Sequence, residues 1–233
     1  MRQLDIQKIL DIGIALTRER DQDRLLQSIL EHAMELTGCD GGTLYRLEEG
    51  ALVFKHMITL SLGVRRGGDG GAIDLPPVPL SPEHVCARAA LEGALINVPD
   101  VYHDTRFDFT GPRRYDALTG YRTVSMLVVP MENDHGEVIG VLQLINAQEG
   151  GRVTAFDPSY ERVVRALASQ AAILLTTIDY AREAEELLRS FVGVMSAAID
   201  ARSRYNANHT RSMARYAERF FDYLSAAGRD WRP

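Results

Sequence analysis

The sequence is poor in three features that would point to particular classes of protein. It holds two cysteines, Cys39 and Cys86, and its first residues form no apolar signal core, which argues for a reducing compartment and against a disulfide scaffold. No apolar run reaches the roughly 18 residues that a bilayer-spanning helix requires. The net charge is −6 and basic residues are scattered among acidic ones, so no nucleic-acid groove is predicted. We expect a cytoplasmic protein that binds neither nucleic acid nor a membrane.

What the sequence does contain is an ordinary globular composition. Hydrophobic residues make up 45% and charged residues 25%, which suffices for a core of normal size. An apolar pattern from Leu4 to Leu16 predicts a first helix. A second helix is predicted from a cap at Asp21–Asp23 through Leu36, with Gly38 as its C-terminal stop.

The strongest strand signal lies between Gly120 and Asn146. Two β-branched runs, 126–130 and 138–145, flank a turn at 133–136 and predict a hairpin. Both runs are apolar at nearly every residue, so we expect both faces of this hairpin to be covered, one by helices and the other by a ligand pocket or a long connection. The other expected elements are a second hairpin (42–47 and 51–59), a Gly- and Pro-rich loop (63–82), a short helix (83–91), a strand (94–98) and an irregular segment (102–117). The loop is favoured as a surface insertion, with a lid over a pocket as the alternative.

The chain from Asp157 onward is predicted to form one long helix, with Asp157 at the cap and Pro158 in the first turn. Apolar residues recur along it at spacings of three and four, a heptad seam broken at Glu185. The seam consists of Val164, Leu167, Ala171, Leu174, Ile178, Ala181, Leu188, Val192, Met195 and Ile199. We expect its first half to pack on the protein's own sheet and the part beyond about Tyr180 to pair with a second copy. The predicted partner is therefore a parallel homodimer, which the helix at 4–16 would join.

Several stretches together resemble one family. They are the hairpin 120–146, Asn97-Val-Pro-Asp-Val-Tyr102, Arg106-Phe107 and Leu118-Thr-Gly-Tyr-Arg-Thr123. As a set they resemble the GAF domain, and within it the branch found in cyclic-nucleotide phosphodiesterases, over residues 22–180. The resemblance implies an α/β (α+β) fold, with a six-stranded antiparallel sheet, flanking N- and C-terminal helices, and then a long coiled-coil-like helix. The implied domains are a dimerisation helix (1–20), a GAF sensor (21–180), a signalling helix (181–197) and a further fragment (198–233).

The resemblance also implies a ligand site. GAF domains that bind cyclic nucleotides hold the ligand beneath a lid, with backbone groups and hydroxyls on the phosphate and apolar residues around the base. The matching residues here are Thr119 and Thr123 as pocket threonines, Asp116 as an acidic pocket residue, and Val85 and Cys86 at the start of the helix that faces the phosphate. Amide groups at a helix start suit an anion, and hydroxyls add donors without the desolvation cost of a charge.

A motif of Asn-Lys, Phe and Asp-Glu marks the family members that bind cyclic nucleotides. Asn146, Phe156 and Glu161 match it, whereas Ala147 and Tyr160 replace its Lys and Asp. Both ends of the Lys–Asp bridge are thus absent together, which leaves no orphan charge. Three alternatives stay open: a cyclic nucleotide, another small molecule, or a ligand-free structural dimerisation module. No cofactor such as a bilin or haem is expected in this chain, because a lone Cys or His is more often packed or solvated.

The last stretch contains Ala198-Ile-Asp-Ala-Arg202, Tyr205 and His209-Thr-Arg211. These residues resemble the opening of an HD-GYP domain, a metal-dependent phosphohydrolase that cleaves cyclic dinucleotides. In that family the residue matching His209 binds a divalent metal, and the other ligands would follow after Pro233. One His cannot hold a metal, so this chain is expected to be inactive by itself. The expected function is a regulatory sensor that controls the downstream phosphohydrolase through a dimeric helix.

Overall fold

A computed structural model describes residues 13, 21–202 and 207–227 of the chain. The chain divides into two compact units, Met1–Ile178 and Asp179–Pro233, and each is considered by itself. The predicted helix at 4–16 lies outside the described residues, apart from Gly13. The elements in chain order are α2 (Gln22–Thr37), β1 (Cys39–Glu48), β2 (Ala51–Thr59), β3 (Val64–Arg66), the 3₁₀ turn η1 (Gly68–Gly70), β4 (Val78–Pro79), α3 (Val85–Glu92), β5 (Ile96–Val98), α4 (Thr110–Thr119), β6 (Met126–Glu132), β7 (Val138–Glu149), β8 (Arg152–Thr154), α5 (Ser159–Arg202) and α6 (Ala207–Ala227).

One antiparallel sheet organises the first unit. Its strands follow the order β3-β2-β1-β7-β6-β5, and the short strands β4 and β8 pair with β2 and β7. The six-stranded antiparallel sheet that the sequence predicts is therefore confirmed, with two short strands added to it. The predicted hairpin is β6–β7, and Gly136 takes a φ of 78° in its turn, where a side chain would be strained.

Helix α2 begins and ends where the sequence predicts. The Asp21 carboxylate accepts a hydrogen bond from the Arg24 N–H (2.9 Å), and Gly38 closes the helix in the left-handed region with a φ of 62°. Its inward face carries the buried side chains Leu25, Leu26, Ile29 and Leu30. Because burial of each such side chain contributes about 1.5–3 kcal/mol, this face holds α2 against the sheet.

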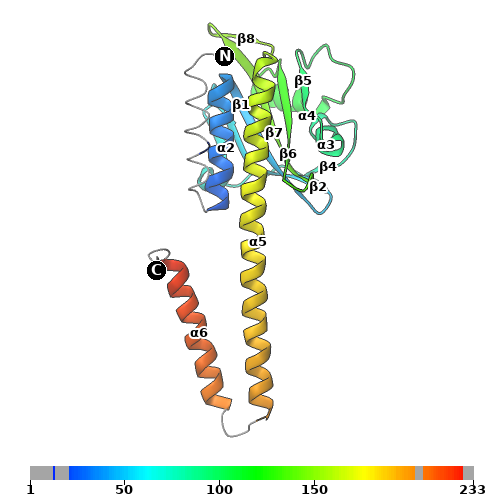
Figure 1. Ribbon diagram of the computed structural model, residues 1–233. Helices are drawn as coiled ribbons and strands as arrows, with labels where there is room; N and C mark the ends of the chain where they lie inside the picture. Colours follow the sequence, from blue (N-terminus) through cyan, green and yellow to red (C-terminus); the bar gives the residue numbers. More distant parts are fainter. Residues whose placement is uncertain (1–12, 14–20, 203–206, 228–233) are drawn as a thin grey trace. The chain divides into compact units, whose positions relative to one another are not determined.

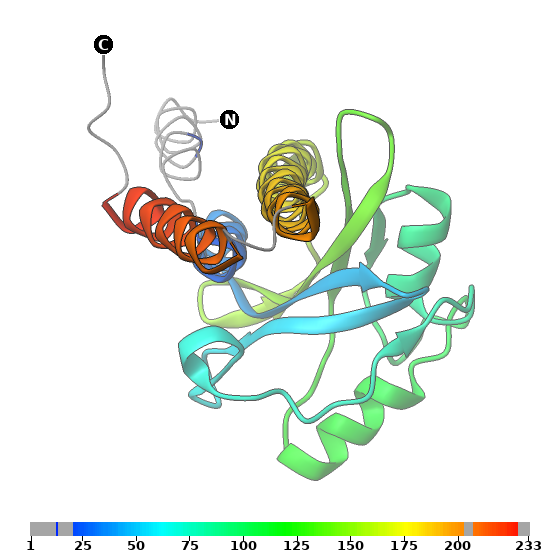
Figure 2. The ribbon, with the colours of Figure 1, turned by 90° about the horizontal axis from the view of Figure 1, so that it is seen from below.

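The sheet has a core on each face. Along β6 the side chains alternate, as a strand requires: Leu127 and Val129 lie in the core beneath α2 and α5, and Met126 and Val128 lie in the core beside α3 and α4. Figures 1 and 2 show the same arrangement, with α2 and α5 on one side of the sheet and α3 and α4 on the other. The prediction that both faces of the hairpin are covered is confirmed.

The structure differs from the sequence prediction in two segments. Residues 110–119 form helix α4 within the stretch expected to be irregular. Only Asp116 is buried in this helix, so its sequence lacks the apolar periodicity by which a helix is predicted. The Asp108 carboxylate accepts a hydrogen bond from the Thr110 N–H (2.8 Å) at its start. The expected loop at 63–82 contains β3, η1 and β4, which are too short to show strand alternation.

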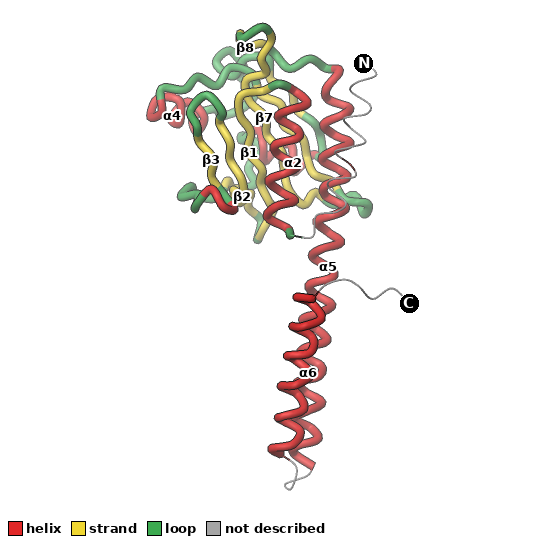
Figure 3. The backbone as a smooth tube through the Cα atoms, turned by 90° about the vertical axis from the view of Figure 1, so that its left-hand side faces the viewer, coloured by secondary structure: helices red, strands yellow, loops and turns green. Residues whose placement is uncertain are grey.

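Helix α5 is one continuous helix of 44 residues, as predicted (Figure 3). The Asp157 carboxylate accepts a hydrogen bond from the Ser159 N–H (2.7 Å) at its start. In the second unit, Arg189 on α5 forms an ion pair with Asp222 on α6 (3.1 Å). No helix within the described ranges is both long and apolar enough to cross a membrane.

Candidate functional site

The predicted site residues Val85 and Cys86 begin α3 and are buried on the α3–α4 face of the sheet. One backbone hydrogen bond joins the residues before α3 to the segment before α4: the Asp108 N–H donates to the Glu83 carbonyl (2.8 Å). Burial raises the pKa of the Cys86 thiol to about 11, so this thiol stays protonated at neutral pH. Cys86 therefore behaves as a small packed side chain rather than a nucleophile.

The structure brings the predicted site residues Asp116 and Thr123 together. The buried Asp116 carboxylate accepts hydrogen bonds from the Thr123 hydroxyl (2.9 Å) and the Thr123 N–H (2.8 Å). It also accepts one from the Tyr102 hydroxyl (2.7 Å). That last bond raises the pKa of Tyr102, which keeps the phenol protonated and donating. The cluster joins α4 to the chain that enters β6.

Thr119 is placed differently from Thr123. It is the last residue of α4 and is exposed, and its hydroxyl donates to the Tyr115 carbonyl one turn earlier (2.8 Å). The same hydroxyl accepts from the Tyr121 N–H (3.3 Å). Because an α-helix rises about 1.5 Å per residue, Thr119 lies about 13 Å along α4 from its first residue, Thr110. Its role in binding stays a prediction.

Asn146 fixes the connection between α4 and β6. It lies in the left-handed region with a φ of 58°. Its Oδ1 accepts from the Val124 N–H (2.7 Å), and its Nδ2 donates to the Arg122 carbonyl (2.8 Å) and the Tyr121 hydroxyl (2.8 Å). These three hydrogen bonds from one buried side chain hold the segment between α4 and β6 against β7. Asn146 therefore positions the neighbouring Thr123, and its own amide does not face a ligand cavity.

Tyr121 and Asp40 belong to the same network, and sequence reasoning assigned them no role. The Tyr121 hydroxyl donates to the Asp40 carboxylate (2.7 Å), which also accepts from the Ser61 hydroxyl (2.6 Å). Burial and this carboxylate raise the pKa of Tyr121, so the phenol remains a donor. Tyr121 stands within the stretch that carries the family resemblance, which is the one signal that could have identified it.

The other two motif residues act at the start of α5. Phe156 is buried in the core beneath α2 and α5. The Asn97 side-chain amide on β5 donates to the Phe156 carbonyl (3.2 Å) and to the Glu161 carboxylate (2.9 Å). The edge strand of the α3–α4 face is therefore tied directly to the first turn of the long helix.

Four arginines stack on two aromatic rings of the α3–α4 face. We call them the arginine group: Arg113 and Arg122 lie 5.4 and 4.3 Å from the Tyr102 ring centre, and Arg88 and Arg106 lie 5.5 and 5.3 Å from that of Phe107. Such cation–π contacts contribute about 0.5–1 kcal/mol each when exposed. Arg106 also pairs with Asp104 (2.6 Å). Arg88 likewise pairs with Glu92 (3.7 Å), so Arg113 and Arg122 are the members of the group that have no ion pair among the described residues.

Two cavities, of about 230 and 430 Å³, lie on the opposite side of the sheet, between α2 and the β2–β3 edge. The predicted ligand-binding residues line neither of them. Across the described residues there is no cluster of three His, Cys, Asp or Glu side chains suited to a metal. The backbone of His209 lies in α6 and its side chain lies outside the described part, so its metal role stays a prediction.

Comparison with known proteins gives one family. Residues 21–175, more than half of the chain, match the GAF domain family. Curated relatives include dual 3′,5′-cyclic-AMP and -GMP phosphodiesterase 11A of Takifugu rubripes (40% identical over 73 residues) and dual 3′,5′-cyclic-AMP and -GMP phosphodiesterase 11 of Drosophila melanogaster (41% over 66 residues). These matches cover 31% and 28% of this chain and 8% and 4% of the relatives, so the chain matches less than a tenth of either relative.

Solved structures agree on the fold. The GAF domain from Acinetobacter phosphoenolpyruvate-protein phosphotransferase has a TM-score of 0.59 at 14% identity, covering 78% of this chain and 99% of that one. Free methionine-R-sulfoxide reductase from Neisseria meningitidis, in complex with its substrate, has a TM-score of 0.56 at 19% identity, covering 76% and 92%. At such low identity the likeness shows the fold alone.

Proposed function

This chain belongs to the GAF domain family, and from that premise we propose that it is the small-molecule-sensing regulatory module of a larger cytoplasmic phosphohydrolase. The ligand would bind on the α3–α4 face and change the position of α5. A ligand can do this only if it binds two arrangements of the module with different affinity. The names of the phosphodiesterase relatives support a cyclic-nucleotide signalling context for the parent protein.

The observation that carries the proposal is the tether between the sensing face and α5. Asn97 on β5 holds both the Phe156 carbonyl and the Glu161 carboxylate. A ligand that moves α3, α4 or β5 would therefore act on the first turn of α5 without any intermediate domain. Helix α5 continues to Arg202, so the same helix belongs to both units of the chain.

The chemistry of the face supports an anionic ligand. Arg113 and Arg122 of the arginine group supply positive charge, and the start of α3 supplies a helix N-terminus. Thr123 directly follows Arg122 in the sequence. A cyclic nucleotide has the matching chemistry, with one negative phosphate and an apolar base. Ala147 and Tyr160, which replace the family's Lys and Asp, leave another small anion as an outcome of the test below.

The downstream part of the proposal concerns residues 179–233. We propose that α5 pairs with a second copy beyond Tyr180, and that residues 198–233 begin an HD-GYP-like domain in which His209 would be one ligand of a divalent metal. The complete protein would then hydrolyse a cyclic dinucleotide, and the module would set the activity of that domain.

Thermal unfolding against a panel of cyclic mononucleotides and cyclic dinucleotides tests sensing. A ligand at a hundred times its Kd stabilises the folded state by about 2.7 kcal/mol. We expect one nucleotide to raise the Tm, and the rise to be lost in Thr123→Val and Arg122→Gln. The matched controls Thr177→Ala and Arg114→Gln, which change the same side-chain types elsewhere, should keep it.

The rival function is a ligand-free dimerisation module. It is favoured by one observation: the hydroxyls of Thr119 and Thr123 and the Asp116 carboxylate already satisfy one another or the backbone. If no nucleotide in the panel changes the Tm, sensing of these ligands is contradicted and the rival stands. A rise that survives in Thr123→Val and Arg122→Gln would place the ligand away from the α3–α4 face.

A further inference from the structure

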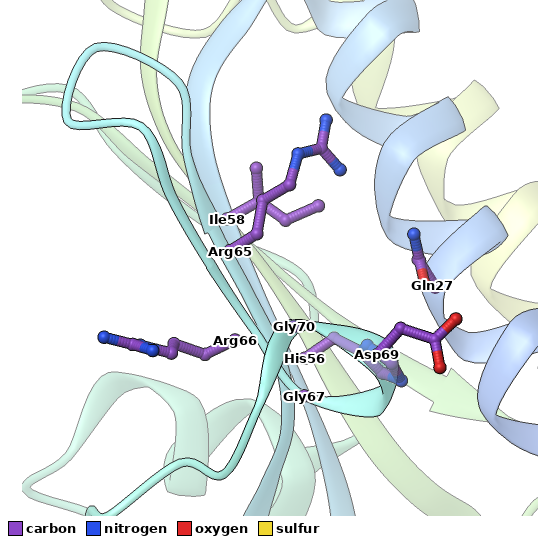
Figure 4. Close-up of a pocket in the computed structure, with 8 residues that line it drawn as sticks. All are labelled: Gln27, His56, Ile58, Arg65, Arg66, Gly67, Asp69 and Gly70. Atoms are coloured by element: carbon purple, nitrogen blue, oxygen red, sulfur yellow. The ribbon is translucent and has the colours of Figure 1, made fainter.

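The cavity of about 230 Å³ lies on the α2 side of the sheet, away from the site proposed above (Figure 4). Its walls come from three segments: α2, β2, and the stretch that runs from β3 into η1. The lining residues are Gln27, His56, Ile58, Arg65, Arg66, Gly67, Asp69 and Gly70. Residues of the α3–α4 face do not line it. Any ligand here would therefore be independent of a nucleotide on the other face.

The wall opposite α2 is a glycine-rich turn, Gly67–Gly71, whose backbone packs closely against β2. A Cβ atom on Gly67 would lie 1.9 Å from the Lys55 carbonyl oxygen, and one on Gly68 would lie 3.1 Å from the His56 ring. Both glycines also have positive φ angles, 93° and 51°. Only glycine fits these positions, and the close approach places Asp69 at the rim of the cavity.

His56 presents an unused polar atom to this cavity. The side chain is 2% exposed, and its Nε2 has no hydrogen-bond partner among the described residues. A buried polar atom without a partner costs about 1–3 kcal/mol, so it is a ready contact for a polar ligand. Figure 4 shows the ring pointing from β2 toward α2, with Asp69 beside it. Burial lowers the pKa of His56, which keeps the imidazole neutral at pH 7.

Charges of opposite sign line the same cavity. Arg65 forms an ion pair with Glu31 on α2 through one guanidinium nitrogen, Nη1. The other N–H groups of the guanidinium can therefore donate hydrogen bonds to a ligand. Asp69 is exposed and has no ion pair or hydrogen bond within the described part of the chain. Gln27 lies on α2 across from these side chains, His56 lies beside Asp69, and Ile58 adds an apolar surface.

We infer that this cavity binds a small zwitterion with the chemistry of a free amino acid. Its carboxylate accepts hydrogen bonds from Arg65 and from the Nε2–H of His56, and its ammonium group pairs with Asp69. Its aliphatic part lies against Ile58. The volume suits about eight non-hydrogen atoms, since a water molecule takes about 30 Å³ of liquid volume. A cation alone would leave the His56 donor and Arg65 unused, and an anion alone would meet Asp69.

Three probes with related carbon chains separate these cases: norvaline carries both charges, butylamine only the positive one and pentanoate only the negative one. The readout is the imidazole signal of His56 in protein labelled with ¹⁵N-histidine, assigned with His56→Gln. We expect norvaline to shift this signal saturably and to bind at least about tenfold more tightly than either other probe.

Substitution of Asp69 provides the matched test. Asp69→Asn removes a charge from an exposed position, and Asp74→Asn makes the same change on the same loop outside the cavity. Asp69→Asn should weaken norvaline binding about tenfold, and Asp74→Asn should leave it unchanged. The inference is overturned if norvaline gives no saturable shift up to about 10 mM, as for a cavity filled with water. It is also overturned if either single-charge probe binds equally well, or if Asp69→Asn has no effect.

Discussion

The two halves of α5 carry similar apolar patterns and have opposite surroundings. In the first half Val164, Ala168 and Leu175 are fully buried beneath the sheet. In the second half Leu187 and Phe191 are 72% and 61% exposed. A heptad pattern therefore predicts that a face of the helix will be covered and does not identify the segment that covers it.

The second half has two apolar stripes rather than one. The predicted seam residues Leu188 and Met195 are each nearly half exposed. A neighbouring stripe is more exposed, and α6 adds a third: these residues are Leu187, Phe191 and Val194 on α5, and Met213, Tyr216, Phe220 and Tyr223 on α6. An apolar surface of this extent indicates an interaction site, and the proposed function assigns it to a second copy.

The largest effect should come from truncating the same residue type in each half. Leu175→Ala removes fully buried atoms and leaves a cavity, so it should lower the free energy of unfolding by about 2–5 kcal/mol. Leu187→Ala, in the exposed half, should change the stability of the first unit by less than about 0.5 kcal/mol. Urea unfolding followed in both variants makes the comparison, and equal losses would show that the two halves do not differ in packing.

A smaller effect should follow from releasing the start of α5. Asn97→Ala removes the bonds to the Phe156 carbonyl and the Glu161 carboxylate, at a cost of about 1–3 kcal/mol. Glu161→Gln keeps an acceptor oxygen and should cost less than Asn97→Ala. Thermal unfolding of both variants measures the difference. If Asn97→Ala is neutral, the tether does not hold the first turn of α5.

The first unit should lose stability in acid because of His56. The folded-state pKa of His56 lies below its unfolded value because of burial, so the unfolded chain binds the proton first as pH falls. Stability from this group is present above about pH 6.5, the unfolded value, and is lost as pH falls toward the folded pKa. Chemical unfolding at pH 7.5 and 5.5 should show a larger loss in the wild type than in His56→Gln. Equal losses would mean that His56 is not buried neutral.

The smallest effect should come from the exposed ion pair of the second unit. Arg189 pairs with Asp222 and Glu185 at the surface, where such pairs add little stability and weaken with salt. Arg189→Ala should therefore lower the Tm only slightly, and less at high salt. Arg182→Ala is the control, on the same stretch of α5. A large drop for Arg189→Ala alone would show that this pair fixes α6 on α5.

Much of the fold could be predicted because its signals are local. The Asp21 cap, the Gly38 stop and the continuous apolar run of β6 each need only neighbouring residues. Helix α4 was missed because a helix with one buried side chain, Asp116, has no apolar period. The strands β3, β4 and β8 were missed because two or three residues cannot show alternation.

The site was predictable only in part, because its contacts join distant segments. The resemblance identified Asp116 and Thr123, which the structure places in one cluster. The bond between Tyr121 and Asp40 spans 81 positions and leaves no local pattern. The His56 cavity was likewise hidden, since the sequence shows a strand and a glycine-rich loop but not that the loop closes over the strand.

The proposed dimer requires a second copy to cover the exposed stripe of α5, and sedimentation equilibrium of the purified chain measures whether the dimer forms. We predict a particle of twice the chain mass of 25.9 kDa. The double variant Leu187→Glu, Phe191→Glu should be monomeric and still folded, whereas Leu118→Glu, at an exposed leucine of α4, should remain a dimer. A wild-type monomer at all concentrations, or a dimer that survives the double variant, would contradict the proposed dimer.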